Sequence, residues 1–139
     1  FPIRAKYDKI NNEEGTIMET QRLPHDHSQK IERKLESMPS AEDFQAIAVL
    51  LKQLGDGNRL RLFWLLCHGE ECVINLSAMV GMSSPAVSHH LRQLASAKLI
   101  VSRREGKEVY YTAAQTEQAQ LFHHMVERLI EIHCPSEGA

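Results

Sequence analysis

The sequence predicts a mainly α-helical domain that carries one small β-hairpin. Its 139 residues, 42% of them hydrophobic, are enough for one domain with a core and too few for two ordinary domains. Apolar residues recur at helical spacing from residue 40 onward, and after Leu99 they alternate with polar ones instead. We therefore expect one domain over residues 40–135, preceded by an N-terminal tail over residues 1–39.

The tail is polar and charge-mixed, so it lacks the apolar surface that an ordered core needs. Its one structured segment is expected over Ser28–Met38, a short amphipathic helix that ends before Pro39. Met18 is a candidate native start, in which case residues 1–17 are a vector-derived or upstream extension that carries no fold argument.

The first helix of the domain is expected to begin after Ser40. Ser40 and Asp43 resemble a capping box, and Gly55 ends the pattern. Between them one helical face stays apolar, through Phe44, Ile47, Ala48, Leu51 and Leu54.

Two shorter helices are expected next. Asn58 can cap the first of them, which ends before Gly69. Its inward face comprises Leu60, Phe63, Trp64 and either Cys67 or Leu66. The second helix runs from about Val73 to Val80 and is broken at Gly81.

The clearest helix start follows that glycine. Ser84 is expected as N-cap and Pro85 at the first helical position, where its missing N–H costs nothing. Val87, Leu91 and Leu94 then face inward. The outward positions are Ser88, His89, Arg92 and Gln93.

A β-hairpin and a last helix complete the domain. Val101 and Arg103 precede the turn Glu105-Gly106-Lys107, and Val109 and Tyr111 follow it, in strand-like alternation. The last helix is expected from about Thr116 to His133, with one apolar stripe formed by Leu121, Phe122, Met125, Leu129 and Ile132.

Two helices joined at residues 81–83 and followed by a basic hairpin form a helix-turn-helix with a wing. Such a unit reads DNA when the second helix presents small and polar side chains to the major groove. Base-reading or helix-positioning residues are expected at Ser83, Ser84, Ser88, His89, Arg92 and Gln93. Phosphate contacts are expected from Arg103, Arg104 and Lys107 in the hairpin.

The charge distribution supports this interpretation, although the formal net charge is −2. Residues 83–108 hold five basic and two acidic residues, a net charge of +3, whereas residues 1–82 carry −2 and residues 109–139 carry −3. The basic charge is therefore concentrated on the predicted reading helix and wing.

Other classes of protein find little support. No apolar run, Leu62–Cys67 included, is long enough to span a membrane, and no secretory signal is visible. Three cysteines are neither even in number nor dense, so we expect a soluble protein of the reducing cytoplasm. Ser88-His89 and His123-His124 resemble catalytic pairs, but no phosphate loop, nucleophile elbow or zinc-hydrolase motif accompanies them. A dimerising protein that keeps the fold without DNA affinity is the remaining alternative.

Three segments resemble the ArsR/SmtB family of winged-helix repressors. They are residues 54–61 (LGDGNRLR), 88–94 (SHHLRQL) and 104–111 (REGKEVYY), in the order and spacing of the family. The resemblance covers roughly residues 44–133. It implies a homodimer that associates through its first and last helices, binds an inverted-repeat operator in double-stranded DNA and is released by an inducer. Two-fold symmetry places the half-sites about 34 Å apart, or a multiple of that distance.

Zinc-sensing members of the family carry an Asp-x-His pair and a His-x-x-Glu or His-x-x-His pair on the last helix. The matching positions here are Gln115, Glu117, Arg128 and Glu131, so three of the four ligands are replaced. Arginine cannot be deprotonated to bind a metal. The resemblance thus implies loss of this site, with Glu117 free to pair with Arg128 of the partner subunit.

Other residues still favour a metal or metalloid inducer, such as zinc or a softer ion. Cys72 keeps the first cysteine of the family's Cys-Val-Cys site, but Ile74 replaces the second. His123 or His124 can share an ion with Glu127 on the last helix. Further ligands are available at His25 and His27 in the tail and at His133 and Cys134 near the C-terminus.

A thiol-based inducer is the alternative. Family members that sense reactive sulfur or oxidants use one cysteine on the second helix and one near the end of the last. Cys67 and Cys134 match this pattern with a displacement of about one turn each. The competing interpretation is that Cys67 is a small buried core residue.

Overall fold

The computed structural model describes residues 23–25 and 31–134. Its contacts divide the chain into two units, residues 1–47 and 48–139. The first unit holds the short helix α2 (Ile31–Leu35) and the start of α3 (Ala41–Gln53). Met18, residues 1–17, His27 and the start of the expected Ser28–Met38 helix lie outside the described residues, and the expected boundary at residue 40 stays a prediction.

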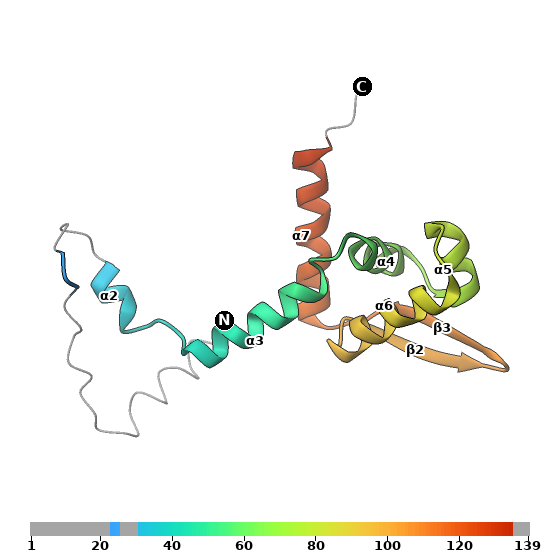
Figure 1. Cartoon of the computed structure of the whole chain (residues 1–139), viewed down its shortest axis with the longest axis horizontal. Helices are drawn as coiled ribbons and strands as arrows, with labels where there is room; N and C mark the ends of the chain where they lie inside the picture. The colour runs from blue at the N-terminus through green and yellow to red at the C-terminus, as the bar shows by residue number, and fades with distance from the viewer. Residues whose placement is uncertain (1–22, 26–30, 135–139) are drawn as a thin grey trace. The chain divides into compact units, whose positions relative to one another are not determined.

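The second unit contains the winged-helix elements (Figure 1). The end of α3 leads into α4 (Gly57–His68), β1 (Glu71–Cys72) and α5 (Val73–Val80). After these come α6 (Ser84–Ser96), the hairpin of β2 (Ile100–Glu105) and β3 (Glu108–Ala113), and the long helix α7 (Glu117–His133). The predicted mainly helical fold with a small hairpin is therefore confirmed.

The predicted starts of α3, α4 and α7 can be compared with the structure here. The Ser40 hydroxyl oxygen accepts a hydrogen bond from the Asp43 backbone N–H, so Ser40 begins α3 as predicted. The prediction that Asn58 caps α4 is wrong. Asp56 is the N-cap, and its carboxylate accepts from the Arg59 N–H at 3.0 Å, which lowers its pKa. Thr116 caps α7 in the same way through the Ala119 N–H.

The sheet has a third strand that sequence reasoning missed. The two residues of β1 pair antiparallel with β3, so the strand order is β1-β3-β2. In this register Cys72, Tyr110 and Arg103 lie opposite one another across the three strands. Gly106, at φ +64°, makes the hairpin turn in the left-handed region that favours glycine.

The core lies where α4, α5 and α6 meet the sheet. Its fully buried side chains are Leu62, Phe63, Leu66, Leu76, Val87, Leu91, Leu94 and Leu99. The inward positions predicted for α6 are thus confirmed, whereas Leu62 of α4 was missed and Leu60 is only half-buried. No described helix is long and apolar enough to cross a membrane.

The sequence predicted one apolar stripe on α7. In the structure the apolar residues of this helix form two sets, one buried and one exposed. Ala119, Phe122 and Val126 are buried within the unit. The other set remains exposed and consists of Leu121, Met125, Leu129, Ile130 and Ile132. An exposed apolar row on a long helix is typical of a protein–protein contact.

Candidate nucleic-acid interface

A tight turn sets the angle between α5 and α6. Gly81 ends α5 in the left-handed region, at φ 68° and ψ 34°, and the N–H groups of Gly81 and Met82 both donate to the Ser77 carbonyl. Ser83 then caps α6, because its hydroxyl oxygen accepts from the Ala86 N–H. The predicted helix-turn-helix is present.

The N-cap of α6 was predicted one residue too late. Ser83, not Ser84, occupies that position, and Ser84 is already helical. The Ser84 hydroxyl instead lies 3.2 Å from the Ser77 hydroxyl on α5. Because the Ser83 hydroxyl oxygen accepts this backbone hydrogen bond, the side chain serves to start the helix. Its O–H remains able to donate.

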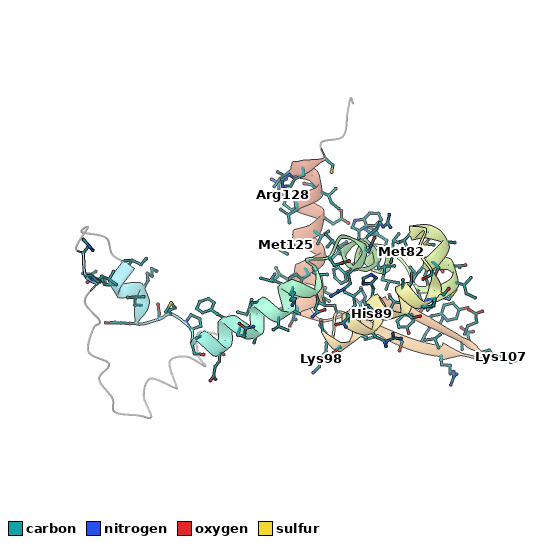
Figure 2. All side chains as sticks on the ribbon, in the orientation of Figure 1. Met82, His89, Lys98, Lys107, Met125 and Arg128 are labelled. Atoms are coloured by element: carbon teal, nitrogen blue, oxygen red, sulfur yellow. The ribbon has the colours of Figure 1, made fainter. Side chains whose placement is uncertain are left out.

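The outer face of α6 presents a short exposed row. Pro85, His89 and Arg92 are exposed at positions i, i+4 and i+7, and Ser88 is half-buried beside them. Figure 2 labels His89 on this helix. Among the residues described, none forms an ion pair or hydrogen bond with the Arg92 guanidinium, which leaves all its donors available.

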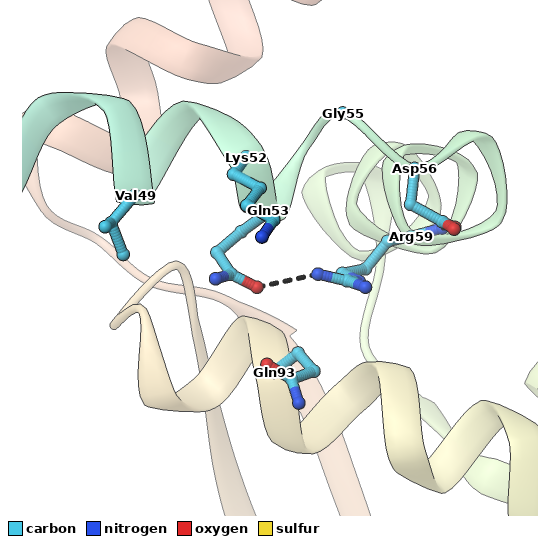
Figure 3. Close-up of a pocket in the computed structure, with 7 residues that line it drawn as sticks. All are labelled: Val49, Lys52, Gln53, Gly55, Asp56, Arg59 and Gln93. Atoms are coloured by element: carbon cyan, nitrogen blue, oxygen red, sulfur yellow. Dashed lines mark hydrogen bonds between the residues drawn. The ribbon is translucent and has the colours of Figure 1, made fainter. Parts of the chain in front are cut away.

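Gln93 lies on a different side of α6. It lines a pocket together with residues from α3, α4 and the turn between them (Figure 3), namely Val49, Lys52, Gln53, Gly55, Asp56 and Arg59. Within this pocket Arg59 donates to the Gln53 side-chain oxygen at 2.7 Å, and its Nε donates to Nδ1 of His90 at 3.4 Å. Gln93 therefore faces the neighbouring helices, and its predicted base contact receives no support from this geometry.

The three cationic side chains of the wing differ in whether they form ion pairs. Arg103 donates from Nε to Glu70 at 2.7 Å and from Nη1 to Glu105 at 2.8 Å, and its guanidinium lies 4.8 Å from the Tyr110 ring centre. The bond from Arg103 lowers the pKa of the Glu70 carboxyl. In the described part of the chain, Arg104 and Lys107 have no such partners, so they are the wing's available phosphate ligands.

A second cluster joins the end of α4 to α7. Nε2 of His68 lies 2.7 Å from Oε1 of Glu127, and Nε2 of His123 lies 3.0 Å from the same oxygen. These bonds from the two histidines lower the pKa of Glu127. The His68 ring is also close to the Trp64 ring, with 4.3 Å between their centres.

The predicted set of metal ligands overlaps this cluster only in part. His123 and Glu127 were named from the sequence, but His68 was missed, because only the packing of α4 on α7 brings it there. His124 is exposed and does not join. In the described part of the chain, only His68, His123 and Glu127 bring three ligand atoms within 4.8 Å of one another. The other candidates, Cys72, His133 and Cys134, are therefore not brought into such a group.

The cysteines are free thiols in this structure. Burial, and secondarily the Glu127 carboxylate, raises the pKa of Cys67 to about 11. A thiol that reacts at neutral pH requires a lowered pKa. Cys67 thus has the properties of a core residue, while Cys134 is exposed at the end of α7.

The residues at the positions of the family's last-helix zinc site are not grouped as metal ligands in the described chain. Arg128 donates to Glu131 of the same helix at 2.9 Å, and both side chains are largely exposed. Gln115 and Glu117 are exposed at the start of α7. The expected pairing of Glu117 across a dimer stays a prediction.

Comparisons with known proteins agree with this geometry. Residues 56–102 match the family described as bacterial regulatory protein, arsR family. A transcriptional repressor SmtB homolog from Synechocystis is 32% identical over 127 residues, which cover 91% of this chain and 94% of the relative. A cadmium resistance transcriptional regulatory protein CadC homolog from Staphylococcus aureus is 30% identical over 68% of this chain and 78% of its own length.

A solved structure supports the same assignment. It is the homodimeric winged helix-turn-helix DNA-binding domain of a possible ArsR-family regulator from Mycobacterium bovis, with a TM-score of 0.60 and 28% identity. The similarity covers 73% of this chain and 98% of that one. The chain belongs to the ArsR/SmtB family of winged helix-turn-helix transcriptional repressors, which are DNA-binding regulators and not enzymes.

Proposed function

We propose that the chain is a homodimeric repressor that binds an inverted-repeat operator and is released by a metal ion. The observation that carries DNA binding is a set of exposed cations on one helix-turn-helix and its wing that have no partner among residues 23–25 and 31–134. They are Arg92, Arg104 and Lys107. Because the rest of the chain is acidic, binding depends on this patch being present twice in a dimer.

The apolar row of α7 supports the dimer. Leu121 is 63% exposed, Leu129 46% and Ile132 57%, which is unfavourable for a helix that faces water. The first helix of the domain, α3, has exposed apolar residues of its own, among them Val49 and Leu51. The similar M. bovis domain is homodimeric, and the same arrangement is proposed for this chain.

The metal inducer is supported by the relatives' names and by the His68–His123–Glu127 cluster. The CadC homolog is named for cadmium resistance, and another relative for arsenical resistance. The thiol alternative through Cys67 and Cys134 stays a prediction, and the raised pKa of Cys67 weighs against it.

Fluorescence anisotropy with labelled DNA from upstream of the protein's own gene tests the proposal. The wild type is expected to bind this DNA more tightly than a scrambled duplex at the same salt concentration. Arg92→Ala is expected to weaken specific binding at least about tenfold, which is the value of one good base contact. Arg33→Ala removes the same charge from an exposed position on α2, outside the winged-helix unit, and is the matched control. Equal affinity of Arg92→Ala and wild type would contradict the assigned reading face.

A further inference from the structure

We propose that His68, His123 and Glu127 form a binding site for one divalent ion of the zinc class within a single protomer. The site joins the last residue of α4 to the middle of α7. It differs in position and ligands from the family's last-helix site, whose residues here are Gln115, Glu117, Arg128 and Glu131. The ion's role as inducer rests on the proposed function, but its binding does not.

The geometry requires only small movements. Ligand atoms about 2.1 Å from a tetrahedral ion lie about 3.4 Å from one another. The Glu127 oxygen is now 2.7 Å from Nε2 of His68 and 3.0 Å from Nε2 of His123. The first separation must open by about 0.7 Å and the second by about 0.4 Å, which side-chain rotation can provide. The side chains are one-third to one-half exposed, so an ion can reach them from solvent.

The chemistry of the three ligands selects the ion. Both histidines now direct Nε2 at one carboxylate oxygen, so each carries its proton on that nitrogen. To bind an ion, each ring must give up the proton on Nε2, so that this nitrogen becomes the ligand atom. Two imidazoles and one carboxylate suit Zn²⁺, Co²⁺ or Ni²⁺, whereas arsenite and other thiophilic species require sulfur.

The residue spacing supports a chelating site. His123 and Glu127 are four residues apart on α7, which places them on one face of the helix, and His68 approaches from a second helix. A fourth position stays open to water, as in other three-ligand zinc sites. An ion bound there links α4 and α7 more firmly than the exposed ion pairs do alone.

The single tryptophan provides a local probe of the site. Trp64 is the only tryptophan in the chain, and its ring centre lies 4.3 Å from that of His68. Co²⁺ titrated into the metal-free full chain is expected to quench Trp64 fluorescence and to saturate at one ion per chain. His123→Gln and Glu127→Gln are each expected to weaken Co²⁺ binding at least about tenfold. His124→Gln, the neighbouring exposed histidine, is the matched control and is expected to keep wild-type affinity.

His68→Gln changes the surroundings of Trp64 directly, so it needs a second measurement. Zinc binding by calorimetry is expected to lose the one-per-chain site in His68→Gln and to keep it in His124→Gln. Circular dichroism checks that each variant is folded. Wild-type affinity in Glu127→Gln or His68→Gln, or an equal loss in His124→Gln, would overturn the site.

The two proposals fail in distinguishable ways. If metal-free wild type does not bind its operator, the proposed function is wrong while the cobalt and zinc titrations still decide the site. If zinc binds at one ion per chain and leaves operator affinity unchanged, the site stands and the inducer role is wrong. If neither ion binds, the site itself is wrong.

Discussion

The wing arginines permit a sharp test, because the sequence predicts the same role for both and the structure separates them. Arg104 has no partner in the described part of the chain, whereas Arg103 is bound to Glu70 and Glu105 and lies over Tyr110. Each phosphate contact changes the slope of log affinity against log salt by about 0.9. A dimer has two copies, so Arg104→Ala is expected to flatten the slope by about 1.8.

The expected affinities follow from that slope. Relative to wild type, the loss of affinity in Arg104→Ala is expected to be about twelvefold larger at 0.05 M than at 0.2 M salt. Arg103→Ala is expected to change the slope by less than half as much, since it removes no phosphate contact. Anisotropy titrations at four salt concentrations measure both slopes, with Arg33→Ala on α2 as the charge control. If Arg103→Ala and Arg104→Ala flatten the slope equally, the conclusion that of the two arginines only Arg104 contacts phosphate is refuted.

Three further predictions concern stability, assembly and reactivity. Ser83→Ala is expected to lower the free energy of unfolding by about 1 kcal/mol in urea titrations at fixed protein concentration. Ser84→Ala is expected to cost less, and the reverse order would contradict the cap assignment. Leu129→Glu is expected to yield monomers in native mass spectrometry, whereas Gln120→Glu on the same helix stays dimeric; a dimeric Leu129→Glu would exclude that row as the interface. At pH 8, Cys67 is expected to be alkylated far more slowly than exposed Cys134, because a thiol with a pKa of about 11 is ionised about one time in a thousand. Peptide mass spectrometry measures both rates, and equal rates would show that Cys67 is not protected.

Features set by local rules were predictable from the sequence. The bounds of α5, the buried row of α6 and the turn at Gly106 depend on spacing and on residue conformation within a few positions. Local rules were less accurate at helix starts, where several polar residues compete. Asp56 precedes Asn58 and Ser83 precedes Ser84, and in each pair the earlier residue has the extended backbone that an N-cap needs.

Features set by long-range contacts were not predictable. The pairing of Arg103 depends on β1, a strand of only two residues with no periodicity to detect, which places Glu70 beside the wing. The sequence likewise gives no reason to join His68 to His123 and Glu127, since 55 residues separate the two histidines. The two faces of α7 could not be separated, because both are apolar and only one meets the core.

Helix α4 connects the two functional regions of the domain. Near its start, Arg59 binds His90 of α6, and Arg61 donates to the Val80 carbonyl at the end of α5 at 2.8 Å. At its end, His68 contacts Glu127 of α7, nine residues or about 13.5 Å beyond Arg59. Between these points, buried side chains pack α4 into the core. An ion at the proposed site would therefore act on a helix that also contacts both helices of the reading unit.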